Sequence, residues 1–103
     1  MTGPQSVEVH GGSIAYERRG DGPPLVLVHG AVSDSRDWRP QLEALSDEFT
    51  VVAWDAPGCG RSFDPSEDYG LDGYADCLAA FIEALGLERP NVLGLSFGSG
   101  LLL

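Results

Sequence analysis

The chain has 103 residues, of which 43% are hydrophobic and 21% are charged, so its length allows one globular domain at most. Its formal net charge of −10 would repel phosphate backbones and anionic lipid surfaces, which excludes nucleic acid as an expected partner. No apolar run approaches the roughly 20 residues that a membrane helix needs, and residues 1–12 lack the features of a signal peptide. We therefore expect a soluble, cytoplasmic protein that does not bind a membrane.

The cysteines and histidines do not form a metal-binding pattern. Cys59, Cys77, His10 and His29 are the only residues of these types, and none has the spacing of zinc ligands. We expect neither a metal nor another cofactor. The sequence leaves open whether the two cysteines form a disulfide.

The first part of the chain predicts two strands and a helix. Residues 13–18 alternate between apolar and polar positions, which is typical of a half-exposed strand. Residues 25–28 form a continuous apolar run, which is typical of a strand buried on both faces. Residues 38–45 carry apolar side chains at i, i+4 and i+7, and Pro40 falls in the first helical turn, where proline is tolerated.

The second part predicts two more strands on either side of the clearest helix. Residues 50–54 are β-branched and aromatic, which favours a buried strand. Residues 74–85 carry one apolar stripe at helical spacing, with Asp72 as the expected N-cap and Gly86 as the expected residue after the C-cap. Residues 91–95 predict another buried strand.

Strands that alternate with crossover helices predict an α/β fold with a mostly parallel sheet. Ligands of such sheets bind beyond the carboxyl ends of the strands. Three segments follow predicted strands directly: residues 29–31, 55–62 and 96–98. These segments also have the most unusual amino-acid sequences in the chain, so we expect the functional site to form from them.

The last of these segments fits the pattern G-x-S-x-G, from Gly94 through Ser96 to Gly98. It directly follows a predicted strand, and the residues after it are compatible with the start of a helix, as a nucleophile elbow requires. The two glycines would let the strand and the helix pack closely. Ser96 is therefore the predicted nucleophile, and the alternative is a glycine-rich turn with an unreactive serine.

Three motifs in this order resemble the α/β-hydrolase superfamily, in its serine branch with His-Gly after a strand: Val28-His29-Gly30-Ala31, Asp55-x-Pro57-Gly58-x-Gly60-x-Ser62, and Gly94-x-Ser96-x-Gly98. The resemblance covers nearly all of the chain but less than half of a family domain. It implies that residues 1–103 form the N-terminal part of an α/β-hydrolase fold, truncated just after the elbow, with the cap and the C-terminal strands absent.

The resemblance also implies roles for the residues around the elbow. The backbone N–H groups of Ala31 and Phe97 would stabilise the oxyanion of a tetrahedral intermediate. Gly30 would let the first loop approach the substrate, and His29 would hold that loop in shape by hydrogen bonding. The family's catalytic base follows the nucleophile in the chain, so His29 is not expected to be that base.

The loop after the strand at residues 50–54 is expected to be structural. The carboxylate of Asp55 would accept backbone N–H groups of the loop, and Arg61 and Ser62 would tie the loop down. A catalytic role for Asp55 is the disfavoured alternative.

A serine at the elbow implies an esterase, lactonase, thioesterase or related hydrolase that acts on a small-molecule substrate in its full-length form. The seven residues after Ser96 contain no Asp, Glu or His, so we expect the chain alone to lack a complete triad and to be inactive. The alternatives are a non-catalytic binding module and one half of a split hydrolase. The edge of the strand at residues 91–95 would be open, so we also expect association through it.

Overall fold

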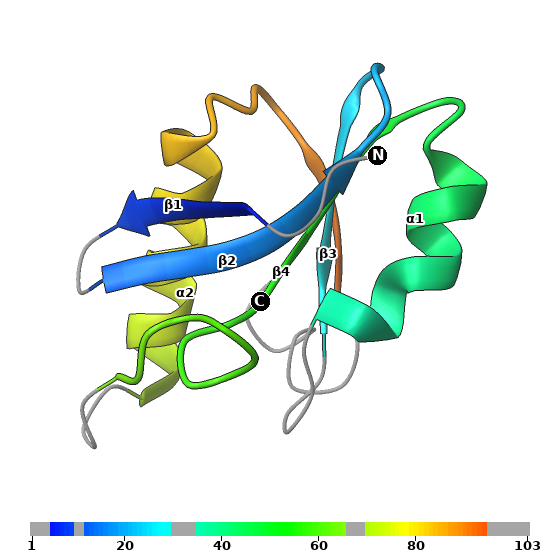
Figure 1. Ribbon diagram of the computed structural model, residues 1–103. Helices are drawn as coiled ribbons and strands as arrows, with labels where there is room; N and C mark the ends of the chain where they lie inside the picture. The colour runs from blue at the N-terminus through cyan, green and yellow to red at the C-terminus, as the bar shows by residue number, and fades with distance from the viewer. Residues whose placement is uncertain (1–4, 10–11, 30–34, 66–69, 95–103) are drawn as a thin grey trace.

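The computed structural model describes residues 5–9, 12–29, 35–65 and 70–94. Its elements are, in chain order, β1 (Gln5–Val9), β2 (Gly12–Arg19), β3 (Pro24–Val28), the 3₁₀-helix η1 (Ser35–Trp38), α1 (Arg39–Leu45), β4 (Thr50–Trp54), α2 (Gly70–Ala84) and β5 (Asn91–Gly94). The strands form one sheet in the order β1-β2-β4-β3-β5 (Figure 1). The predicted α/β fold is confirmed.

The sheet is mixed, with a parallel half and an antiparallel half. β3 lies between β4 and β5 and is parallel to both, whereas β2 is antiparallel to β1 and to β4. The parallel pairing places Leu27 beside Ala53, and Val28 beside Gly94. The chain therefore leaves β3, β4 and β5 at the same edge of the sheet, which is where the sequence motifs begin.

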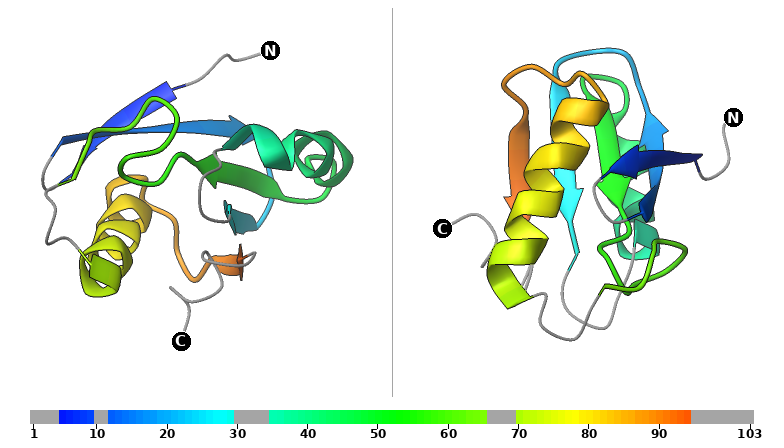
Figure 2. Two further views of the ribbon diagram at one scale, coloured as in Figure 1. Left: turned by 90° about the horizontal axis from the view of Figure 1, so that it is seen from below. Right: turned by 90° about the vertical axis from the view of Figure 1, so that its left-hand side faces the viewer.

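One helix covers each face of the sheet, as Figure 2 shows. Successive side chains of a strand point to opposite faces, so the buried strands β3 and β4 contribute to two apolar clusters. The cluster on the α2 side includes Ile14, Tyr16, Val26, Val28, Val52, Trp54 and Phe81. The cluster on the α1 side consists of Leu27, Trp38, Leu42, Val51 and Ala53.

β1 was not predicted from the sequence. Its residues alternate between half-buried and exposed positions, and only Val7 and Val9 pack against the α2 side of the core. Such a short stretch with two apolar side chains gives a weak strand signal. Pairing with β2, which sets Val7 opposite Ile14, is what makes it a strand.

β2 is more buried than a half-exposed strand. Ala15 is buried, and the side chain of Glu17, which lies on the same face of the strand, is only 16% exposed. The low exposure of Glu17 has a clear reason: its side chain contacts Ser35 of η1 and Arg39 at the start of α1. Beside this strand, the Ala15 N–H donates to Ser62 of the loop after β4.

The two predicted ends of α2 had different outcomes. The helix begins before Asp72, so this residue is not the N-cap but lies in the first turn, where its negative charge favours the helix dipole. Gly86 does end the helix, with a φ of +68°. The Gly86 N–H donates to the carbonyl oxygen of Glu83, and the Leu87 N–H to that of Ile82, which is a Schellman motif.

The start of α1 matches the expectation from Pro40, which lies in the first helical turn. Within the described parts of the chain, no helix combines the length and the apolar character that crossing a membrane requires.

Candidate active site

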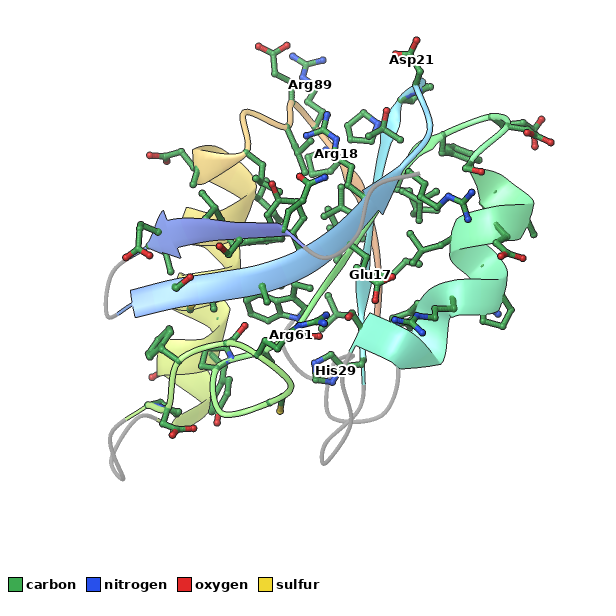
Figure 3. All side chains as sticks on the ribbon, viewed as in Figure 1. Glu17, Arg18, Asp21, His29, Arg61 and Arg89 are labelled. Atoms are coloured by element: carbon green, nitrogen blue, oxygen red, sulfur yellow. The ribbon has the colours of Figure 1, made fainter. Side chains whose placement is uncertain are left out.

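The loops after β3 and β4 begin next to each other at the carboxyl end of the parallel strands. Figure 3 shows His29 and Arg61 at this end of the molecule, whereas Asp21 and Arg89 lie at the opposite end. His29 directly follows β3, and Asp55 directly follows β4. Both side chains are buried, so their polar atoms must find partners inside the protein.

His29 links the two loops. Its Nε2 atom accepts a hydrogen bond from the backbone N–H of Ala56, with an N–N distance of 3.0 Å. An amide N–H can only donate, so in the neutral ring the proton lies on Nδ1. Nε2 is thus engaged in holding the loops together.

Asp55 connects the loop after β4 to the start of η1. Its Oδ1 accepts a hydrogen bond from the backbone N–H of Ser35 at 2.7 Å, and its Oδ2 accepts one from the backbone N–H of Arg61 at 3.2 Å. The guanidinium of Arg61 adds an ion pair, with 3.8 Å between Nη2 and Oδ2. Charge-assisted bonds of this kind are stronger than neutral ones, so this carboxylate fixes two loops at once.

Ser62 ties the loop after β4 to β2. Its hydroxyl donates to the carbonyl oxygen of Asp55 and accepts from the N–H of Ala15 at an N–O distance of 2.9 Å. The Phe63 N–H donates to the carbonyl oxygen of Ser13 at 2.9 Å. The loop is thereby held against β2 at Ser62 and Phe63.

Glu17 and Ser35 belong to the same group of contacts, and sequence reasoning missed both. Glu17 Oε2 lies 3.3 Å from the Ser35 hydroxyl oxygen and 3.3 Å from the Arg39 guanidinium. Figure 3 shows Glu17 on the α1 side of the strands. In the sequence, Glu17 looks like an outward-facing strand residue, and only its contacts with η1 and α1 reveal that it is half-buried.

Tyr74 of α2 lies near the loop after β4. Burial, with a smaller contribution from Cys59, raises the pKa of the Tyr74 phenol above its ordinary value of 10.0. The phenol is therefore protonated at neutral pH. Cys59 is a half-buried thiol and Cys77 a buried one. Among the described residues, no cluster of three or more His, Cys, Asp or Glu side chains has the arrangement to hold a metal ion.

Several predicted site residues lie outside the described residues: Gly30, Ala31, Ser96, Phe97 and Gly98. The described part of the elbow motif is Gly94, the last residue of β5. Gly94 pairs with Val28, the residue before His29. The structure thus brings together the starting points of the first and third motifs, next to the loop that follows Asp55.

Comparisons with known proteins agree with this arrangement. Residues 23–103 match the family model of the alpha/beta hydrolase fold. The chain is 36% identical over 92 residues to an uncharacterized protein of Mycobacterium tuberculosis, which covers 89% of this chain and 27% of that protein. It is 37% identical over 84 residues to the (E)-2-((N-methylformamido)methylene)succinate hydrolase of Acinetobacter baylyi, which covers 82% of this chain and 32% of that enzyme. The chain thus spans about a third or less of the length of these relatives.

Solved structures superpose over nearly the whole chain. A membrane phospholipase A, described as a bacterial virulence factor, matches with a TM-score of 0.91 and 33% identity, over 96% of this chain and 33% of that one. An N-acyl homoserine lactonase in complex with N-hexanoyl homoserine lactone matches with a TM-score of 0.90 and 31% identity, over 97% of this chain and 39% of that one. A haloalkane dehalogenase from Bradyrhizobium elkani matches with a TM-score of 0.91 and 27% identity, over 97% of this chain and 35% of that one.

Proposed function

The chain belongs to the alpha/beta hydrolase fold family, and from this membership we propose that it is the N-terminal part of a serine hydrolase. In this proposal Ser96 is the nucleophile, and the backbone N–H groups of Ala31 and Phe97 stabilise the oxyanion. The pairing of Val28 with Gly94 supports it most directly. Because these neighbouring parallel strands end together, the segment with Ala31 and the segment with Ser96 start from adjacent points.

The proposed reaction is an acyl transfer to Ser96 followed by hydrolysis. The serine oxygen attacks the carbonyl carbon of the substrate while a general base takes the hydroxyl proton, and the leaving group departs with a proton. Water then releases the acyl group. Residues 97–103 contain no Asp, Glu or His, and Nε2 of His29 is occupied by a backbone N–H. We therefore expect the polypeptide of residues 1–103 alone to be inactive.

The proposed substrate class is a small molecule with an ester-like or related acyl bond. A serine in the elbow favours this chemistry, and two of the structural neighbours are named for acyl-bond substrates, a phospholipase and a lactonase. A cytoplasmic location is part of the same proposal, and cell fractionation would test it.

The decisive experiment compares Ser96→Ala with Ser99→Ala in the full-length product of the gene. Both the turnover of an activated ester and covalent labelling by a fluorophosphonate would be measured. We expect Ser96→Ala to lose labelling and at least about 1,000-fold in kcat, because removing a triad member leaves only the contribution of the oxyanion hole and binding.

Ser99→Ala is the matched control, since it removes a hydroxyl three residues away, and it should keep both signals. Labelling that persists in Ser96→Ala would refute the proposed nucleophile. Turnover by residues 1–103 alone would refute the expected inactivity.

A further inference from the structure

The half-buried carboxylate of Glu17 has no part in the proposed reaction, and its partial withdrawal from water still needs a physical reason. Its side chain is only 16% exposed, and it contacts Ser35 of η1 and Arg39 of α1. Withdrawing a carboxylate from water is unfavourable unless polar partners replace the water. Here both partners contact the same oxygen, Oε2: the hydroxyl of Ser35 and the guanidinium of Arg39.

Of the two residues that contact Glu17, Ser35 indicates more about the role of this carboxylate than Arg39 does. It is 0% exposed, and both of its hydrogen-bond donors point to acidic side chains. The backbone N–H donates to Oδ1 of Asp55 at 2.7 Å, and the hydroxyl donates to Oε2 of Glu17 at 3.3 Å. Two carboxylates from separate segments therefore hold one residue, which we call the Ser35 junction (Glu17, Ser35 and Asp55).

The Ser35 junction lies directly after the segment that contains Ala31, one of the proposed oxyanion donors. Ser35 is the first residue of η1 and follows residues 30–34, which include Ala31. His29, on the other side of that segment, is bonded to the N–H of Ala56. The two described residues that flank the segment are thus both anchored to neighbouring residues, Asp55 and Ala56, at the end of β4.

We propose that Glu17 is a positioning residue, which acts through the hydroxyl of Ser35 to set where the segment carrying Ala31 returns to the fold. This inference rests on the proposed function, because it assigns Glu17 its effect through the oxyanion donor at Ala31. Glu17 itself does not contact the substrate. Small displacements of a positioning group reduce the rate of the chemical step more than they weaken substrate binding.

Ser35, rather than Arg39, is the partner through which Glu17 acts. The side chain of Arg39 is 56% exposed, so water and salt screen its attraction to Glu17. Ser35 is 0% exposed, so bulk water cannot replace Glu17 as the hydrogen-bond acceptor of its hydroxyl. Ser35→Ala should therefore slow the reaction at least as much as Glu17→Gln, whereas Arg39→Gln should have a smaller effect than either.

The test uses the full-length gene product with the variants Glu17→Gln, Ser35→Ala and the double variant. Loss of a whole oxyanion donor costs about 100-fold to 1,000-fold in kcat, so we expect a partial misplacement to cost about 10-fold with KM changed less than about 2-fold. Glu17→Gln leaves a neutral, weaker acceptor for the Ser35 hydroxyl, whereas Ser35→Ala removes the donor. The double variant should therefore be no slower than Ser35→Ala, because both changes act on the same interaction. Amide hydrogen exchange at Ser35 should be faster in all three.

Glu43→Gln is the matched control. Glu43 is also paired with an arginine, Arg19, at 3.7 Å, but its side chain is 76% exposed. In the Glu43→Gln variant, we expect both kcat and the rate of amide hydrogen exchange at Ser35 to equal the wild-type values. Thermal unfolding of each variant separates a positioning effect from a loss of folded protein, and Ser35→Ala serves as the test if Glu17→Gln does not fold.

The outcomes also separate this inference from the proposed function. If Ser96→Ala abolishes turnover while Glu17→Gln and Ser35→Ala leave kcat unchanged, the positioning role is wrong and the serine hydrolase stands. Effects of the two single variants that multiply in the double variant would likewise overturn the inference. If Ser96→Ala has no effect, the proposed function fails, and unchanged exchange at Ser35 in Glu17→Gln would then refute the junction itself.

Discussion

At the scale of single residues, Asp55 shows how one side chain can organise several segments. Its two carboxylate oxygens accept backbone N–H groups from η1 and from its own loop, and its backbone carbonyl accepts the hydroxyl of Ser62. A carboxylate suits this position because it offers acceptors in several directions and no donor when ionised. These contacts join three parts of the chain, and the structural role that the resemblance implies for Asp55 stays a prediction.

Gly60 is the residue on which the compact form of that loop depends. Its φ is +50°, and a Cβ atom added there would lie 2.5 Å from Cγ of Asp55. The carboxylate would have to move, although it is buried and bonded to Ser35 and Arg61. Glycine is thus required here both for backbone conformation and for space.

We predict that Gly60→Ala lowers the free energy of unfolding more than Gly86→Ala does. Gly86 has a similar φ of +68° but no heavy atom within 4 Å of an added Cβ, so Gly86→Ala should cost about 1 kcal/mol from the backbone alone. Gly60→Ala should cost about 1–3 kcal/mol more because of overpacking. Denaturant unfolding of the full-length protein measures both, and equal losses would show that Asp55 moves aside freely.

At the scale of elements, α2 holds the antiparallel and parallel halves of the sheet together. Its buried Phe81 packs edge-on against Tyr16 of β2, with ring centroids 5.5 Å apart. The same ring contacts Trp54 of β4 at a centroid distance of 5.6 Å. Aromatic contacts of this kind add to the large hydrophobic gain from burying each ring.

We predict that Phe81→Ala lowers the free energy of unfolding by about 3–5 kcal/mol, because it leaves a cavity between the helix and two strands. Glu83→Ala is the control on the same helix, since Glu83 is exposed, and it should stay within about 0.5 kcal/mol of the wild type. The midpoint of denaturant unfolding decides. A Phe81→Ala loss below about 1 kcal/mol would contradict the assigned core.

At the scale of the whole molecule, net charge and sheet geometry have opposite effects on the association of the chain with other copies of itself. The net charge of −10 makes copies of the chain repel one another. In the described sheet, however, β5 lies at one end of the strand order and pairs only with β3. An unpaired strand edge favours association with another chain.

We predict that the polypeptide of residues 1–103, expressed alone, associates and that added salt strengthens the association. Salt screens the repulsion between acidic chains, whereas it leaves the backbone pairing of strand edges nearly unchanged. Gel filtration with light scattering at low and high salt measures the mass. A monomer at both salt concentrations, with one cooperative thermal transition, would contradict this prediction.

The sequence by itself determined the main elements and the edge of the sheet at which the motifs begin. The buried runs of β3 and β4, the apolar stripe of α2 and the helix end at Gly86 are local patterns, because they depend on the spacing of neighbouring side chains. The order of alternating strands and helices then placed the three motifs at the carboxyl ends of the strands.

Only the tertiary structure decided which strands pair with one another and which side chains are covered by segments from elsewhere in the chain. β1 becomes a strand by pairing with β2, and the antiparallel contact of β2 with β4 makes the sheet mixed. Glu17 is half-buried because residues of η1 and α1 contact it, and its contact with Ser35 joins residues 18 positions apart. The physical reason is that burial and hydrogen bonding depend on what packs from elsewhere in the chain, which side-chain periodicity does not encode.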